Sequence, residues 1–75
     1  MSAERSNRGE LTRAEIVRAA YQLFVTHGYN GTSMRQIARD AGVALGGIYN
    51  HFASKEELFL DVLIHQHPLQ SILPL

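Results

Sequence analysis

Histidine, aspartate and serine are the residue types in this sequence that could bind a metal ion or activate a nucleophile. His65 and His67 are two residues apart, which places them about 200° apart on a helix, so they cannot share a face as paired zinc ligands do. Asp61 and His65 can share a face, but a pair of ligands does not make a metal site. The sequence contains no nucleophile elbow and no built carboxylate pair. It therefore predicts no metal site, no bound cofactor and no catalysis.

A different chemistry is indicated by residues 33–52, which have the pattern of two short helices joined by a tight turn. Ser33 and Gln36 have the spacing of a capping box that opens the first helix. Gly42 stands where a helix needs a left-handed residue to end. The second helix is expected from Leu45 to His51. This spacing is that of a helix-turn-helix, which places its second helix in the major groove of double-stranded DNA.

Several side chains of this stretch could contact base edges. Arginine can bridge O6 and N7 of guanine, and asparagine can bridge N6 and N7 of adenine, which makes Arg35 and Asn50 candidates. The apolar side chains of Ala44 and Leu45 suit thymine methyl groups. Gly46 would permit close approach to the DNA backbone. The alternative for Asn50 is an ordinary polar residue on the surface.

The helix that precedes this stretch is predicted from apolar periodicity after Leu11. Thr12 and Glu15 form a capping box at its start, and Gly28 is expected to end it. Residues 1–10 are polar and have no period, so we expect them to form a disordered arm. The apolar residues recur at the spacing of one helix face and are Ile16, Ala19, Ala20, Leu23 and Phe24.

A further helix is predicted after the helix-turn-helix. Ser54 and Glu57 form its capping box, and Pro68 stops it. Its apolar residues Leu58, Phe59, Val62 and Leu63 form one stripe, whereas Leu60 and Ile64 lie off that stripe. The expected organisation is an all-α three-helix bundle plus the start of a fourth helix over residues 11–67, followed by an unassigned tail over residues 68–75.

The charges are segregated along the chain although the net charge is zero. Residues 1–39 carry six arginines and three glutamates, whereas residues 40–75 carry one lysine and four carboxylates. The basic half could steer the surface toward phosphate, and the alternative is an ordinary solvated surface. There is no cysteine, and no apolar run is long enough to span a bilayer. These features predict a cytoplasmic protein without a membrane segment.

Together these pieces resemble the DNA-binding domain of the tetracycline-repressor (TetR) family of bacterial transcription regulators. The resemblance covers IVRAAYQLFVTHGY, TSMRQIARDAGV, GGIYNHF and SKEELF. It implies a homeodomain-like head that recognises a DNA operator, most often to repress transcription. It also implies that the fourth helix leads to a larger helical domain that binds a small-molecule effector and forms a homodimer. We do not expect that larger domain within these 75 residues.

The resemblance also assigns residue roles. It implies phosphate contacts by Thr32 or Ser33, Tyr49, His51 and Lys55. Tyr49 could instead pack against the core, and Lys55 could be an ordinary solvated residue. The family often has serine or threonine at the position of Ala44, so the second helix of the motif is expected to lack a side-chain cap, at a cost of about 1 kcal/mol.

Two alternative functions stay open at this point. The chain could be a truncated or frame-shifted remnant of a regulator, without DNA-binding activity of its own. It could also be a helical protein-interaction module in which Leu60, Ile64 and the tail dock on a partner.

Overall fold

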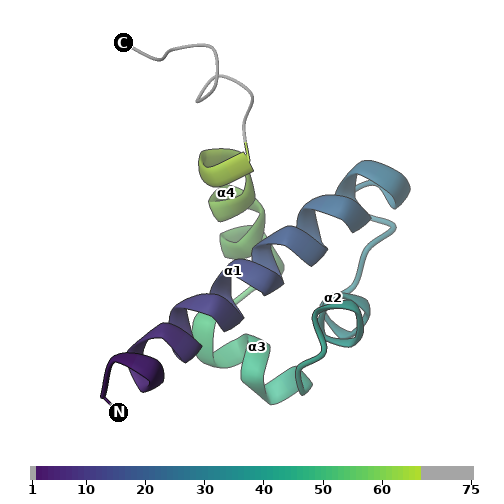
Figure 1. Ribbon diagram of the computed structural model, residues 1–75. Helices are drawn as coiled ribbons and strands as arrows, with labels where there is room; N and C mark the ends of the chain where they lie inside the picture. The colour runs from purple at the N-terminus through teal and green to yellow at the C-terminus, as the bar shows by residue number, and fades with distance from the viewer. Residues whose placement is uncertain (1, 67–75) are drawn as a thin grey trace, which may run out of the picture.

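The computed structural model describes the backbone of residues 2–66 and the side chains of residues 11–65, and this part of the chain is entirely helical apart from its connections. The elements are α1 (Ser2–His27), α2 (Met34–Ala41), α3 (Leu45–His51) and α4 (Lys55–Gln66). Figure 1 shows α1 crossing the molecule diagonally, with α2 and α3 below it and α4 behind it. Helix α1 packs against both α2 and α4, and α2 packs against α3. The predicted all-α class is confirmed.

One core joins all four helices. The apolar face predicted for α1 is buried throughout, and Ile37 and Ala38 of α2 are buried against it. Ile48 is the buried residue of α3, and Phe52 follows it directly after the end of the helix. Leu58 and Val62 close the core from α4. Because α3 contributes little apolar area of its own, its position depends on Ile48 and Phe52.

The predicted boundaries of α2 are confirmed by its hydrogen bonds. The Ser33 hydroxyl accepts from the Gln36 N–H at 3.1 Å, and the Gln36 side chain accepts from the Ser33 N–H at 2.9 Å. At the other end, Gly42 adopts φ 76°. Its N–H donates to the Arg39 carbonyl, and the N–H of Val43 donates to the Ala38 carbonyl. These two bonds form a Schellman motif, which ends α2 and turns the chain into α3.

The start of α1 differs from the expectation. The helix begins at Ser2 and continues through Thr12, so the prediction of a disordered arm before a capped start at Thr12 is wrong. Its first residues contain the good helix formers alanine, glutamate and arginine, and Gly9 alone costs a helix only about 1 kcal/mol. The end of α1 is as expected, because Gly28 follows His27 with φ 82°. The domain limits at residues 11 and 67 stay a prediction.

Helix α4 also departs in detail from the prediction. The Ser54 hydroxyl accepts from the Glu57 N–H at 3.2 Å, as expected, but the Glu57 carboxylate accepts from Ala53, one residue before the cap. Leu60 and Ile64 are exposed, and so is Leu63, which was expected on the inner stripe. The described helix ends at Gln66, and both His67 and the tail over 68–75 lie outside the described residues.

Candidate nucleic-acid interface

Helix α3 has one buried side and one side open to solvent. Ile48 is completely buried, and Phe52 is buried directly after the helix. The predicted contact residues lie on the other sides of α3. Ala44, Gly46, Tyr49 and Asn50 are exposed, whereas Leu45 and His51 are half-buried. Of these two, Leu45 also packs against the core. The core therefore fixes the orientation in which α3 presents these residues.

Gly46 lies at an open position. A methyl group built onto Gly46 would meet no atom of the described residues within 4 Å, whereas one built onto Gly47 would be 3.9 Å from the Val43 side chain. Packing within the chain therefore does not require glycine at position 46, and alanine would favour the helix by about 1 kcal/mol. The open space at Gly46 is compatible with the close approach of DNA expected from the sequence.

Helix α3 begins without a side-chain cap, as predicted. Ala44 has the extended backbone of an N-cap residue, with φ −71° and ψ 154°, and its carbonyl accepts from the N–H groups of Gly47 and Ile48. A methyl side chain offers no oxygen to the free N–H groups of the first turn. Those groups are left for solvent or for a bound partner.

The start of α2 carries two exposed candidates. Ser33 uses its oxygen to cap α2, but its hydroxyl proton is not used in that bond and could be donated to a phosphate. Arg35 follows on the exposed surface of the same first turn. Both side chains are accessible, and their roles in DNA binding stay predictions.

Thr32 does not have the position predicted for a phosphate contact. Its residue is only 2% exposed. Its single hydroxyl proton is shared between the carbonyl oxygens of Gly28 at 2.8 Å and Leu23 at 3.1 Å, at the end of α1. The hydroxyl therefore closes the connection between α1 and α2, and of the pair Thr32 or Ser33 the structure leaves Ser33 accessible.

Lys55 is engaged within the chain rather than solvated. Its ammonium donates to the carbonyl oxygens of Tyr29 and Thr32, each at 2.8 Å, and lies 4.2 Å from the centroid of the Tyr29 ring. The Tyr29 ring itself packs against the rings of Phe24 and Phe59, which also contact each other. The carbonyls and the ring supply the negative partners that a cation at the start of a helix requires. Of the three ammonium protons, one is left for an outside acceptor.

Arg13 lies outside the predicted set but contacts the end of α3. Its guanidinium donates to the carbonyl oxygen of His51 and to the carboxylate of Asp61, and it lies over the ring of Phe52. The spacing of Arg13 from these partners in the sequence, 38 and 48 residues, gives no local signal. Only the tertiary fold reveals this contact.

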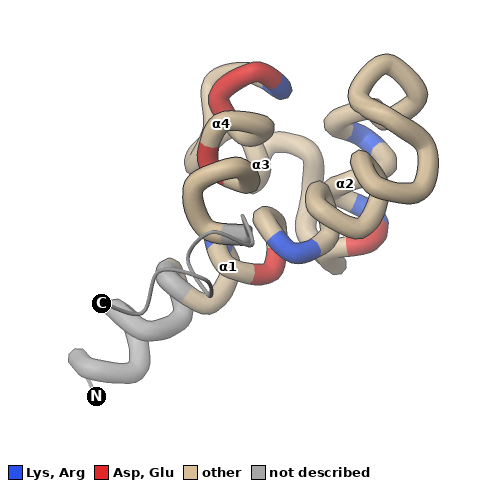
Figure 2. Tube along the Cα trace, turned by 90° about the horizontal axis from the view of Figure 1, so that it is seen from above, with Lys and Arg blue, Asp and Glu red and all other residues tan. Residues whose placement is uncertain are grey.

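The balance of charge differs between α2 and α4. Figure 2 shows basic positions along α2 with an acidic position at the end of that helix, whereas α4 begins with a basic position that acidic positions follow. The first turn of α4 contains Glu56 and Glu57, whereas the first turn of α2 contains no acidic residue. The helix-turn-helix surface near α2 is therefore the better of these two faces for a polyanion.

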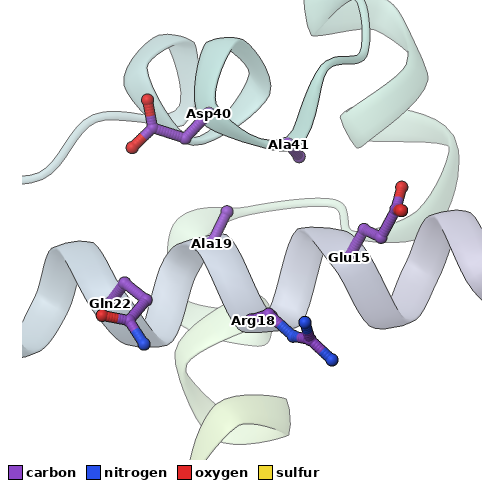
Figure 3. Close-up of a pocket in the computed structure, with 6 residues that line it drawn as sticks. All are labelled: Glu15, Arg18, Ala19, Gln22, Asp40 and Ala41. Carbon is purple, nitrogen blue, oxygen red and sulfur yellow. The ribbon is translucent and has the colours of Figure 1, made fainter.

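A shallow hollow separates α1 from the end of α2 (Figure 3). Its volume is about 440 Å³, and Ala19 points from α1 toward Asp40 and Ala41 of α2. Its rim also carries Glu15, Arg18 and Gln22. The rim therefore bears charges of both signs, which does not favour a nucleic-acid surface there.

Among the described side chains of residues 11–65 there is no group of three histidine, cysteine, aspartate or glutamate residues placed to hold a metal ion. Asp61 and His65 contact each other at 3.5 Å as a surface pair. Within the same range, no helix is both long and apolar enough to cross a membrane.

Comparison with known proteins identifies relatives that are described as transcriptional regulators or repressors. The regulator SrpR of Pseudomonas putida is 41% identical over 71 residues, which are 93% of this chain and 33% of SrpR. The transcriptional repressor AcnR of Corynebacterium efficiens is 37% identical over 80% of this chain and 32% of its own length. The crystal structure of NalD, a repressor of the MexAB-OprM multidrug efflux pump in Pseudomonas aeruginosa, matches with a TM-score of 0.73 and 46% identity over 75% of this chain and 28% of NalD.

The chain thus spans about a third of the length of the curated relatives it matches. The family model described as bacterial regulatory proteins of the tetR family matches residues 16–62, from the buried face of α1 to the middle of α4. That family comprises transcription regulators and not enzymes. The chain belongs to the TetR family and corresponds to its N-terminal helix-turn-helix DNA-binding domain.

Proposed function

We propose that this chain binds an operator in double-stranded DNA by inserting α3 into the major groove. The observation that supports this most directly is the open face of α3, where Gly46, Tyr49 and Asn50 lie exposed opposite the buried Ile48. Helices of this size fit the major groove, where each base pair presents a distinct pattern of donors and acceptors. The open α3 face is thus the reading surface of the motif.

The proposed contacts divide into two classes. Ser33, Tyr49 and His51 contact phosphates, because a hydroxyl, a phenol and an imidazole all suit phosphate oxygens. Lys55 assists with the one proton that its carbonyl contacts leave free. Base edges are contacted by the remaining candidates, which are Arg35, Ala44, Leu45, Gly46 and Asn50.

The biological outcome that we propose is repression of transcription in the bacterial cytoplasm. AcnR and NalD are both named as repressors, and occupation of an operator blocks access to a promoter. A homodimer would read two half-sites about one helical turn or more apart. Dimerisation and binding of a small-molecule effector would require the larger domain that the family resemblance implies.

The exposed apolar side of α4 favours a second role for that helix. Leu60, Leu63 and Ile64 are 58%, 42% and 59% exposed and lie within two turns of one another. Exposed apolar side chains grouped in this way are typical of a surface that docks on another helical body. We propose that this side of α4 is an association surface that operates together with DNA binding.

The test is DNA binding as a function of salt concentration. The probes are a duplex enriched from a random pool by the chain itself and a duplex of unrelated sequence. Arg35→Ala should lower affinity for the enriched duplex by about 1 to 3 kcal/mol if Arg35 contacts a base. Tyr49→Phe, which removes only the phenol oxygen, should weaken binding to both duplexes.

Arg18→Ala is the matched control, because it removes the same charge from an exposed position on α1 outside the proposed interface. Any loss of DNA affinity that is common to Arg18→Ala and Arg35→Ala reflects the change in net charge alone. If Arg35→Ala and Tyr49→Phe bind both duplexes as well as Arg18→Ala does, the proposed interface is wrong.

A further inference from the structure

The C-terminal end of α3 is held by a side chain of α1. Nη1 of Arg13 lies 3.2 Å from the carbonyl oxygen of His51, the last residue of α3. Nη2 of the same guanidinium lies 3.5 Å from Oδ1 of Asp61 on α4. The guanidinium carbon lies 4.3 Å from the centroid of the Phe52 ring. One side chain thus connects three helices at the end of the recognition helix.

This contact matters for the stability of α3 because the helix has little stability of its own. It contains seven residues, two of which are adjacent glycines, and its first turn has no side-chain cap. The last carbonyls of a helix have no intrahelical donor, and a cation there also complements the helix dipole. Arg13 supplies both the donor and the cation from another helix.

Asp61 determines where the guanidinium lies. Its side chain is only 15% exposed, whereas that of Arg13 is 45% exposed. His65 also contacts the Asp61 carboxylate at 3.5 Å from the next turn of α4. The less exposed carboxylate therefore holds the guanidinium of the more exposed Arg13, and the same guanidinium lies over the Phe52 ring.

We propose that Arg13 is a positioning residue for DNA recognition, which fixes the orientation of α3 through the His51 carbonyl while Asp61 holds the guanidinium in place. The consequence for DNA affinity rests on the proposed function. The consequence for α3 itself does not, since the contacts lie within the chain.

The first experiment measures amide hydrogen exchange in the full chain. In Arg13→Ala, the N–H groups of Ile48 and Phe52, which close α3, should exchange about three- to tenfold faster. The N–H of Ile37, bonded to the Ser33 carbonyl in α2, should be unchanged. Equal acceleration in α2 and α3, or no change in α3, would overturn the proposal. Arg18→Ala is the control for charge and for loss of a long side chain on α1.

The second experiment compares the enriched and unrelated duplexes. Loss of the positioning contact should lower affinity for the enriched duplex more than for the unrelated one, because only the former requires a fixed α3. Arg13→Lys should recover part of this loss, since one ammonium can reach the His51 carbonyl but lacks the planar fork that also holds Asp61. Asp61→Asn should likewise lower affinity for the enriched duplex more than affinity for the unrelated duplex.

The two experiments separate the possible failures. If the wild-type chain binds neither duplex, the proposed function fails, but hydrogen exchange still decides whether Arg13 fixes α3. If Arg13→Ala weakens both duplexes equally and leaves exchange in α3 unchanged, then Arg13 acts as a charge near phosphate and the positioning role is wrong.

Discussion

The ammonium of Lys55 lies 2.8 Å from the carbonyl oxygen of Thr32, so the first residue of α4 is bonded to the residue that precedes the cap of α2. The hydroxyl of Thr32 meanwhile donates to the end of α1. Three helices are therefore joined through one backbone carbonyl and one buried hydroxyl. This junction places Ser33, the accessible candidate at the start of α2.

Replacement of Lys55 by methionine should destabilise the fold. Methionine keeps an unbranched apolar stem but leaves the carbonyls of Tyr29 and Thr32 without their donor. Hydrogen bonds from a charged group contribute more to stability than those between neutral groups. The partial exposure of Lys55 reduces this contribution. We expect a loss of about 1 to 2 kcal/mol in the free energy of unfolding, measured by urea denaturation.

The control for this variant is Glu56→Gln, which alters the neighbouring exposed residue. Glu56→Gln should change the free energy of unfolding by less than about 0.5 kcal/mol. Equal stability of Lys55→Met and wild type would show that Lys55 is a solvated residue after all, and would restore it as a free phosphate donor.

Thr32→Val should also destabilise the chain without changing its interface. Valine matches the shape of threonine but removes the hydroxyl proton from the carbonyls of Leu23 and Gly28. The expected loss is about 1 to 2 kcal/mol by thermal or urea unfolding. Because the side chain is buried, the slope of DNA affinity against salt should equal that of wild type. A reduced slope would instead indicate that Thr32 contacts phosphate.

The elements that could be predicted from the sequence are those whose signals are local. The capping box of Ser33 and Gln36, the left-handed Gly42 and the bounds of α3 all depend on residues within a few positions of one another. Their geometry therefore followed from side-chain chemistry alone.

The roles of Thr32, Lys55 and Arg13 could not be predicted in this way. Lys55 and Arg13 each bond a backbone carbonyl that only the tertiary fold brings near, across 23 and 38 residues. Thr32 bonds carbonyls four and nine residues before it, but the sequence carries no signal that its side chain turns inward to them. A polar side chain near a helix start looks the same in a sequence whether it faces solvent or a buried carbonyl. Sequence resemblance correctly located the motif, but the structure separates its accessible residues from its internal ones.

Ala44→Ser should stabilise α3. Ala44 already has the extended backbone of an N-cap residue, so a serine hydroxyl could accept from a free N–H of the first turn without a change in the chain. We expect a gain of about 0.5 to 1 kcal/mol by urea denaturation. Ala44→Val, which adds apolar bulk but no acceptor, is the control and should give no gain. A loss of stability in Ala44→Ser would mean that another group already serves as the cap.

The last prediction compares the two adjacent glycines of α3. Gly46→Ala and Gly47→Ala should both favour the helix by up to about 1 kcal/mol, since neither added methyl group meets a close atom of the described residues. Of the two glycines, Gly46 is exposed on the open side of α3, whereas Gly47 is half-buried toward Val43.

If DNA approaches at Gly46, its added methyl group should cost about 1 to 3 kcal/mol in affinity for the enriched duplex, as overpacking does elsewhere. Gly47→Ala should retain affinity while it gains the same stability. Fluorescence anisotropy with both duplexes measures the difference, alongside urea denaturation of each variant. Wild-type affinity in Gly46→Ala would show that the DNA backbone does not come close to this position. The contact surface would then be centred on Tyr49 and Asn50.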